Sequence, residues 1–399
     1  MSKITDLECG NLMDFITTFF SGFYTLVVGT LFPYIAMLTI LVFVHEFGHF
    51  IVGRWCGVKV NVFAIGFGPE LFGFTDNKNT RWKFCAIPLG GYVKFAGDAN
   101  GASMPDANSL SAMDKEEREG SLFFKPVWKR ALIVAAGPIA NFILAIALFA
   151  GLFYVRGLPI LQPVIGIVKA GSPAEAGGLK FGDRILSIDG AAINSFEDLV
   201  ATVGINSNNP LKFNVERDGL DVALTITPLL VERTTNLGVD RHGQIGAQST
   251  QDSKYFVVKS LTIPEAVIYG AQKSWFIIDR TVRYFGGLIA GREKADQISG
   301  PIGIAHVVGE MAKDGLPNLI FLAAVISVSL GFFNLLPVPI LDGGHLLYFL
   351  VEAIRRRPLS LGVQEFGFRI GMGLLAMLIL FATYNDLVQR IPWRKIMGS

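Results

Sequence analysis

The chain has 399 residues, of which 51% are apolar and only 17% charged, and its mean hydropathy is +0.47. A soluble domain carries about 25% charged residues, so this composition indicates lipid-facing surface. The net charge of +2 argues against a nucleic-acid partner, because such proteins concentrate positive charge. Three cysteines without a C-x-x-C pair argue against a disulfide framework and a zinc–cysteine site. We therefore expect a polytopic α-helical membrane protein with room for a soluble domain.

Four segments are long enough to cross a bilayer, which takes about 20 apolar residues. The stretch 15–52 predicts one long, tilted span that ends at Arg54, preceded by an interfacial segment around 15–24, since it lacks the polar turn that two spans would need. The other predicted spans are 131–155, an interrupted span over 319–354, and 366–387.

Lysine and arginine crowd three span ends, at Arg54, within 125–130 and at 355–357. The positive-inside rule places these ends in the cytoplasm, so the insert between spans two and three lies on the opposite side. The N- and C-termini lie there too, although basic residues at 390–395 argue mildly against this placement.

The segment 61–97 predicts strands, because it is rich in aromatic and β-branched residues with glycine at the breaks. The polar stretch 100–120 predicts a linker. Residues of about 163–230 predict a small α/β domain, with Ser195 capping a helix and Asp218-Gly219 forming a hairpin turn. An amphipathic helical stretch at 264–288 and a glycine-broken segment at 298–305 complete the insert.

The motif HEFGH, from His45 to His49, lies inside the first predicted span. Residues four apart share one face of a helix, so both imidazoles can bind one zinc ion, and Glu46 can act as the general base. Ionisable groups inside a membrane helix are costly, which favours a buried use. The alternative is a polar turn near the membrane interface.

A catalytic zinc usually takes three protein ligands. Asp342 is the better candidate for the third, because it is a lone carboxylate in the apolar stretch 319–350. Pro337 and Pro339 interrupt the helix before it, and Gly343-Gly344 permits an unusual backbone path. A helix cap without a metal is the alternative for Asp342. His345 is expected to support the site or to pack beside it.

Five motifs in this order, HEFGH, PLGGYVKFAG, AAGPIANF, ISGPIGIA and NLLPVPILDGGH, resemble the site-2 protease family (peptidase M50), in its RseP-like branch. The resemblance implies zinc bound by His45, His49 and Asp342, with Glu46 as the catalytic base. It also implies that the substrate backbone is held by Asn334, Gly90, Gly91, Tyr92 and Val93. Asn141 is expected to face the site or its packing.

The insert resembles a PDZ domain in the circularly permuted form of bacterial proteases, through the phrase SPAEAGGLKFGDRILSIDG. An unrelated small β-domain is the alternative. Better-known family members carry two tandem PDZ domains, whereas this insert has room for one.

These patterns predict seven regions. They are 1–54 (N-terminal segment and first span with the zinc motif), 55–124 (cytoplasmic-side, membrane-associated β-element and linker), 125–157 (second span), 158–232 (periplasmic PDZ-like domain), 233–317 (periplasmic segment with amphipathic helices), 318–357 (third span with the LDG motif) and 358–399 (fourth span and C-terminus).

The resemblance implies an intramembrane zinc endopeptidase in a bacterial inner membrane, with its active site near the cytoplasmic side. It would cleave single-span membrane proteins of the anti-sigma-factor type in regulated intramembrane proteolysis. The PDZ-like domain would bind a peptide or protein segment, and the other contacts would be with lipid rather than nucleic acid. A membrane scaffold and a small-solute transporter are the alternatives; the scaffold leaves HEFGH and LDG together unexplained, and the transporter lacks a visible repeat.

Overall fold

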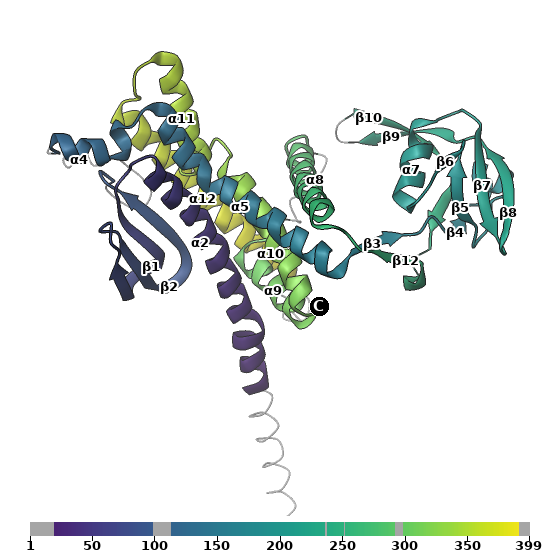
Figure 1. Cartoon of the computed structure of the whole chain (residues 1–399), viewed down its shortest axis with the longest axis horizontal. Helices are drawn as coiled ribbons and strands as arrows, with labels where there is room; N and C mark the ends of the chain where they lie inside the picture. The colour runs from purple at the N-terminus through teal and green to yellow at the C-terminus, as the bar shows by residue number, and fades with distance from the viewer. Residues whose placement is uncertain (1–19, 99–112, 236–237, 251, 292–297, 391–399) are drawn as a thin grey trace, which may run out of the picture. The chain divides into compact units, whose positions relative to one another are not determined.

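The computed structural model describes residues 20–98, 113–235, 238–250, 252–291 and 298–390. The chain divides into two compact units: unit 1 is Met1–Ala150, Val267–Ile278 and Ala295–Ser399, and unit 2 is Gly151–Ala266 and Asp279–Lys294. The helices that contribute to unit 1 are η1 (Thr25–Leu31), α2 (Phe32–Trp55), α4 (Lys115–Gly120), η2 (Leu122–Phe124), α5 (Val127–Arg156), α8 (Ile263–Ile289), α9 (Pro301–Lys313), α10 (Leu316–Asn334), α11 (Asp342–Arg355) and α12 (Leu361–Arg390) (Figure 1).

Four helices in the described part of the chain are long and apolar enough to cross a membrane: Phe20–Trp55, Val127–Arg156, Leu316–Asn334 and Gly362–Val388. They fall where the sequence predicts spans. The first helix is continuous from Phe20, so the described part of the expected interfacial segment joins the span without a break; residues 15–19 lie outside the described ranges. Pro33 cannot donate a hydrogen bond to the turn before it, and that turn widens into the π-helix η1 instead of breaking.

Helices α2 and α5 pack closely through small residues. A Cβ atom at Gly48 of α2 would collide with the Ala136 carbonyl of α5 and lie 2.8 Å from the Ala140 side chain. Small residues allow apolar helices to approach closely, where packing and hydrogen bonds hold them together. This contact fixes α5 against the helix turn that carries HEFGH.

The predicted strands form one antiparallel hairpin, β1 (Val60–Thr75) and β2 (Arg81–Phe95). Phe63 of β1 pairs with Trp82 near the start of β2 and with Val93 near its end. The first half of β1 therefore lies between the two halves of β2, and the last residues of β2 form an edge of the sheet. The rings of Phe50, Phe63 and Trp82 pack at centroid distances of 4.4–5.4 Å and fasten this sheet to α2.

Two predicted irregular segments contain helix. In the predicted linker, Asp114 and Glu117 form a capping box that starts α4, whereas residues 99–112 lie outside the described residues. The glycine-broken segment 298–305 is helical from Pro301. Its Gly303 makes room for Asp386 of α12, which accepts a hydrogen bond of 2.7 Å from the Gly303 N–H.

The third predicted span is interrupted as expected. α10 ends at Asn334, residues 335–341 form turns around two prolines, and α11 begins at Asp342. Gly343 and Gly344 were predicted to allow an unusual backbone path, but neither has a positive φ. Each packs against backbone instead: a Cβ atom on Gly343 would collide with the Leu335 carbonyl, and one on Gly344 would lie 2.5 Å from Cα of Pro339.

Unit 2 is a small domain of short strands with two short helices. Its helices are α6 (Pro173–Ala176) and α7 (Phe196–Ile205), with the 3-10 turn η3 (Ser253–Tyr255). Its strands are β3 (Leu158–Leu161), β4 (Ile165–Val168), β5 (Arg184–Ile188), β6 (Ala191–Ala192), β7 (Leu211–Arg217), β8 (Leu220–Ile226), β9 (Leu229–Thr235), β10 (Gly238–Gln244), β11 (Ala247–Ser249) and β12 (Phe256–Lys259). The main sheet has the order β6-β5-β7-β8, and β11 pairs with β4.

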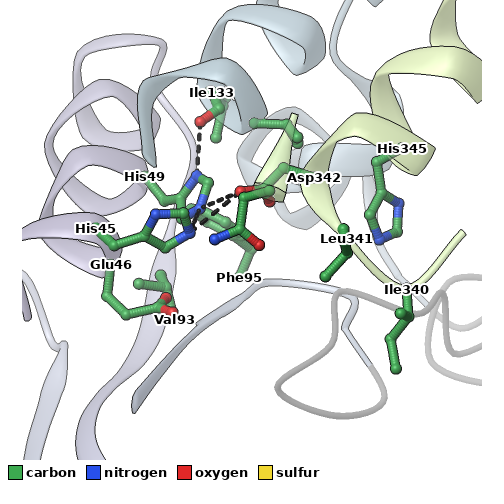
Figure 2. A pocket seen from close by; sticks show the side chains of 12 residues that line it. His45, Glu46, His49, Val93, Phe95, Ile133, Ile340, Leu341, Asp342 and His345 are labelled. Atoms are coloured by element: carbon green, nitrogen blue, oxygen red, sulfur yellow. Dashed lines mark hydrogen bonds and ion pairs between the residues drawn. The ribbon is translucent and has the colours of Figure 1, made fainter. Parts of the chain in front are cut away.

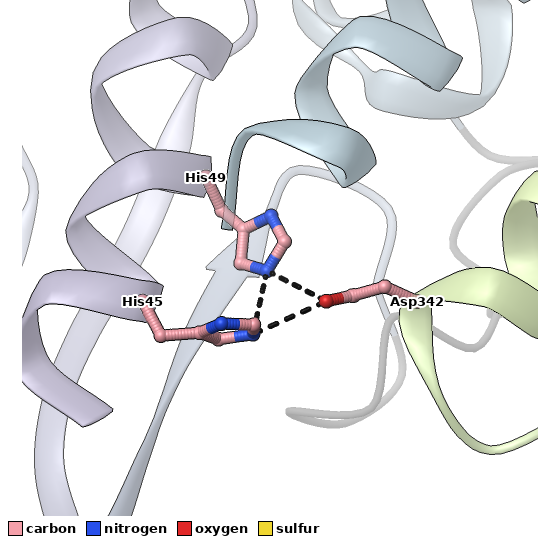
Figure 3. A group of neighbouring side chains, drawn as sticks. All are labelled: His45, His49 and Asp342. Carbon is pink, nitrogen blue, oxygen red and sulfur yellow. Dashed lines mark hydrogen bonds and ion pairs between the residues drawn. The ribbon is translucent and has the colours of Figure 1, made fainter. Parts of the chain in front are cut away.

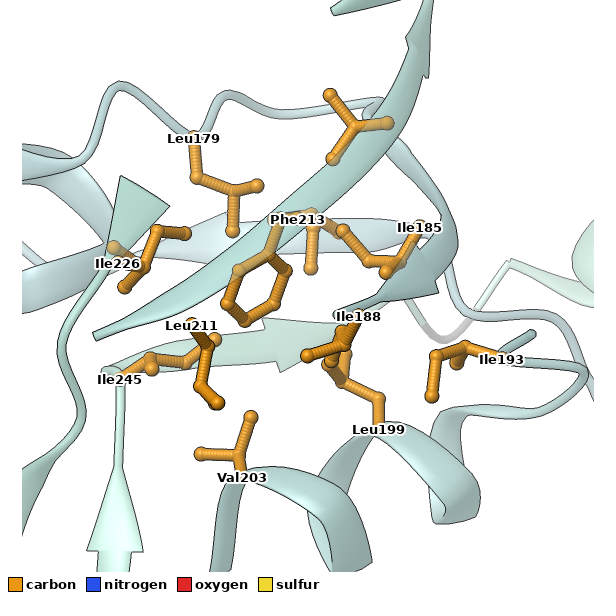
Figure 4. Packing of buried hydrophobic residues seen from close by; sticks show 13 residues of the cluster. Leu179, Ile185, Ile188, Ile193, Leu199, Val203, Leu211, Phe213, Ile226 and Ile245 are labelled. Carbon is orange, nitrogen blue, oxygen red and sulfur yellow. The ribbon is translucent and has the colours of Figure 1, made fainter. Parts of the chain in front are cut away.

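Local signals in unit 2 act as predicted. Ser195 and Asp198 form the capping box of α7, and Asp218 and Gly219 adopt positive φ in the turn between β7 and β8. The boundary at 232 was wrong: Ile245 lies in the core, which Figure 4 shows around Phe213. The domain therefore extends to β11, since that strand completes the pairing of β4.

Candidate metal centre

Two imidazoles converge on one face of α2. His45 and His49 lie one turn apart, their Nε2 atoms are 3.3 Å apart, and their exposed fractions are 7% and 9%. The i, i+4 spacing that the sequence motif provides places them in this position. Both rings therefore present a nitrogen to the same point inside the protein.

A carboxylate from almost 300 residues further on completes the group. Asp342 is the first residue of α11, and its Oδ2 lies 3.1 Å from Nε2 of His45 and 3.5 Å from Nε2 of His49. Figure 3 shows the three donor atoms facing one another. These three side chains form the group in the described residues whose ligand atoms are close enough to hold one metal ion.

The donor set fits zinc. A tetrahedral site with bonds of 2.0–2.1 Å separates its ligand atoms by about 3.3 Å, close to the three distances found here. The Oδ2 atom of Asp342 is buried and has no hydrogen-bond partner in the described residues apart from the facing imidazoles. A buried carboxylate oxygen without a donor is costly, and a cation between the three atoms would remove that cost.

Helix α5 supports both imidazoles from behind. The Nδ1 atom of His49 lies 2.9 Å from the Ile133 carbonyl oxygen, and the Asn141 amide lies 3.0 Å from Nδ1 of His45. Gly137 lies between them in the sequence, where a Cβ atom would lie 3.0 Å from Cε1 of His45 and collide with the His49 ring. Positions 133, 137 and 141 recur every four residues, so one face of α5 serves both rings.

The Asn141 amide has a defined orientation when His45 binds a metal through Nε2. The structure has the Asn141 Nδ2 atom facing Nδ1 of His45. With a metal on Nε2, Nδ1 carries the hydrogen and needs an acceptor, which the amide supplies by turning its Oδ1 atom toward the ring. Asn141 is fully buried and its Oδ1 is otherwise without a partner, so this orientation satisfies both groups. Ser327 of α10 donates a 2.8 Å hydrogen bond to the Asn141 carbonyl and fixes this turn of α5.

A cavity of about 180 Å³ opens beside the three donors (Figure 2). Its polar lining side chains are His45, Glu46, His49, Asn334, Asp342 and His345, and its apolar ones are Val93, Phe95, Ile133, Val134, Ile340 and Leu341. Glu46 lies on the side of β2, where it is hydrogen-bonded to the backbone of Val93. Gly91 of β2 lies beside Glu46, and a Cβ atom there would lie 2.7 Å from the Ala64 carbonyl oxygen, so the two strands pack closely at this point.

The residues predicted to hold substrate are only partly gathered at this cavity. Asn334, at the end of α10, and Val93 line it. Gly90, Gly91 and Tyr92 lie on the same strand but are not among its lining residues, and the Tyr92 ring stacks on Phe67 at 6.2 Å. The Ile133 contact was missed, because a backbone carbonyl leaves no signal in the side-chain sequence.

Comparison with known proteins identifies the family of this chain. The sequence model of Peptidase family M50 matches residues 33–378. A protein of Agrobacterium fabrum named as a zinc metalloprotease is 49% identical over 92% of this chain and 97% of its own length. Metalloprotease MmpA of Caulobacter vibrioides is 43% identical over 92% and 96% of the two chains. The chain belongs to peptidase family M50 and is a zinc metallopeptidase.

Among solved structures, one similar protein covers a small part of the chain. The PDZ domain of an SdrC-like protein from Listeria monocytogenes is 22% identical, covers 24% of this chain and 94% of its own, and gives a TM-score of 0.19.

Proposed function

We propose that this enzyme is an intramembrane zinc endopeptidase that cleaves the membrane-spanning segments of single-span proteins. The observation that carries the proposal is the meeting of His45, His49 and Asp342 at one point between helices apolar enough to lie in a membrane. Zinc bound there would polarise the scissile carbonyl and lower the pKa of water to about 7. Glu46 borders the same cavity and is the base that takes a proton from water.

The substrate backbone has two neighbours in this proposal. Asn334 lines the cavity, and the edge of β2 from Gly90 to Val93 can pair with an extended segment. A substrate helix must therefore unwind before cleavage, because strand addition uses main-chain hydrogen bonds that a helix keeps for itself. The apolar lining suits the side chains of such a segment.

The soluble unit has a separate role in the proposal. Unit 2 has the element order expected of a PDZ-like domain, and we assign it to the periplasm, where it binds a peptide or protein segment or excludes bulky substrates. The basic residues at the start of α5 and at the C-terminal ends of α2 and α11 then lie in the cytoplasm, and the metal centre lies near that side of a bacterial inner membrane. Anti-sigma factors are the expected substrate class, and regulated intramembrane proteolysis the process.

The test uses the full-length protein in detergent with a single-span reporter. Glu46→Gln should abolish cleavage while the zinc content stays at the wild-type level, and Asp342→Asn should lower both. Glu310→Gln is the matched control, because that carboxylate is exposed and pairs only with Lys313 in its own helix. Cleavage by Glu46→Gln at the wild-type rate would refute the assignment of the base.

A further inference from the structure

His345 is a polar side chain of the cavity that the proposed function does not use. The other polar lining residues are the three candidate ligands, the base Glu46, and Asn334. The rest of the lining is apolar, so a ring that offers an N–H here has little competition from other donors. The sequence predicted only a supporting or packing role for it.

The position of His345 follows from the start of α11. It lies three residues after Asp342 and therefore on the same side of the helix. Gly343 and Gly344, which separate the two residues in the chain, have no side chains that could lie between Asp342 and His345. Figure 2 shows His345 on the side of Asp342 opposite to Glu46. A group bound at the metal centre would therefore have the base on one side and this imidazole on the other.

The His345 ring packs against an aromatic neighbour, and its nitrogens have no hydrogen-bond partner in the described part of the chain. Tyr348, one turn further along α11, packs edge-on against it at a centroid distance of 6.3 Å and an interplanar angle of 84°. Among the residues that the structure describes, the imidazole makes no hydrogen bond. His345 is half-buried and lines the cavity, so its N–H is an oriented donor that a group bound in the cavity can use.

We propose that His345 is a catalytic residue that donates a hydrogen bond to the carbonyl oxygen of the scissile peptide bond. The inference rests on the proposed function. As the oxygen of water bonds to the carbonyl carbon, Glu46 takes one proton of that water and the carbonyl oxygen gains negative charge. His345 stabilises that charge with its N–H. The carbon–nitrogen bond then breaks, the proton passes from Glu46 to the leaving nitrogen, and the carboxyl product keeps the water oxygen.

The size of the expected effect follows from similar donors in other hydrolases. Removal of one donor to a developing oxyanion lowers kcat by about 10²–10³-fold, and KM is little affected because the charge develops only in the transition state. His345→Leu should show this loss with wild-type zinc content. His345→Gln, which keeps an N–H donor, should recover part of the rate.

The experiment measures kcat, KM and bound zinc for full-length protein with the single-span reporter. Tyr348→Phe is the matched control on the same helix, because it keeps the ring and removes a hydroxyl that has no partner among the described residues; it should cleave like the wild type. His345→Gln also tests the proposal if His345→Leu fails to fold.

Two results would overturn the assignment of His345 alone. One is a folded His345→Leu protein whose kcat stays within about threefold of the wild type, where about 10²-fold is expected. The other is a loss of activity that follows a loss of zinc in both His345 variants, which would make the residue a support of the metal site. A zinc-loaded wild-type protein that cleaves no single-span reporter would instead refute the proposed function and, with it, this proposal.

Discussion

The contact between Asn141 and His45 gives a sharp test of how the metal centre is built. Asn141→Leu keeps the size of the side chain and removes the acceptor for the His45 Nδ1–H. The contact is 3.0 Å long and fully buried, so no water replaces the lost oxygen. A buried donor without a partner costs about 1–3 kcal/mol, which corresponds to a zinc affinity about 5–150-fold weaker. In other metalloproteins, mutation of a residue that hydrogen-bonds to a metal ligand weakens metal binding by about 10–100-fold, which is the same range.

The assay is competition for zinc with a chelator of known affinity, which does not depend on proteolysis. Asn141→Asp is the control, because it has the same shape and keeps an oxygen toward His45. It should bind zinc within about threefold of the wild type, or more tightly, since the buried carboxylate also faces the cation. Equal zinc affinities of the wild type and a folded Asn141→Leu protein would refute the reasoning that α5 orients His45.

Three further predictions test separate parts of the molecule. Gly137→Val should lower zinc content to near zero in protein that still inserts in membranes, because the added side chain occupies the space of both imidazole rings; metal analysis checks this, and a zinc-loaded variant would contradict it. In unit 2, Arg217→Leu should lower the free energy of unfolding by about 3–5 kcal/mol, because it leaves the carboxylate of Asp183 buried without its ion-pair partner at 2.7 Å. Denaturant unfolding of the full chain measures this, with Arg184→Leu as a control, since that arginine pairs only at the surface at 3.8 Å. At the hairpin, burial alone would raise the pKa of Asp76, but hydrogen bonds from Thr80, Trp82, Lys78 and Arg54 lower it to about 2 from 3.8. This stabilisation is complete above pH 4 and is lost as the pH falls through about 2, so Trp82 fluorescence should change over that window in the wild type and not in Asp76→Asn.

The sequence predicted those parts of the structure that depend on local periodicity. Apolar runs of about 20 residues located the four long helices, and the i, i+4 spacing placed His45 and His49 on one face. Capping residues marked the start of α7 correctly, because the side chains that satisfy its first amides lie three residues apart in the chain. The break before Asp342 followed from two prolines, which cannot continue the hydrogen bonds of a helix.

Features that depend on distant contacts were predicted less well. The predicted end of the PDZ-like domain at 232 was wrong, because β4 pairs with β11 about 80 residues later. No local sequence pattern predicts that pairing. The two glycines after Asp342 were interpreted through backbone freedom, whereas close approach of the 335–339 turn requires them. The acceptor for His49 is a main-chain carbonyl, so any residue at 133 could supply it. Such contacts are visible only once α2 and α5 are placed side by side.

Helix α5 contacts α2, α10 and α11, and so it positions the parts of the metal centre that lie far apart in the sequence. It holds α2 through the contacts of Ile133 and Asn141 with the two imidazoles, and it receives the Ser327 hydroxyl from α10. At its start, Arg130 pairs with Glu352 of α11 at 2.5 Å, and both side chains are largely buried. Because α11 carries Asp342 at its other end, this ion pair fixes the helix that presents the third donor. A displacement of α5 would therefore disturb all three donors together, which explains why no one of these helices could form the metal centre by itself.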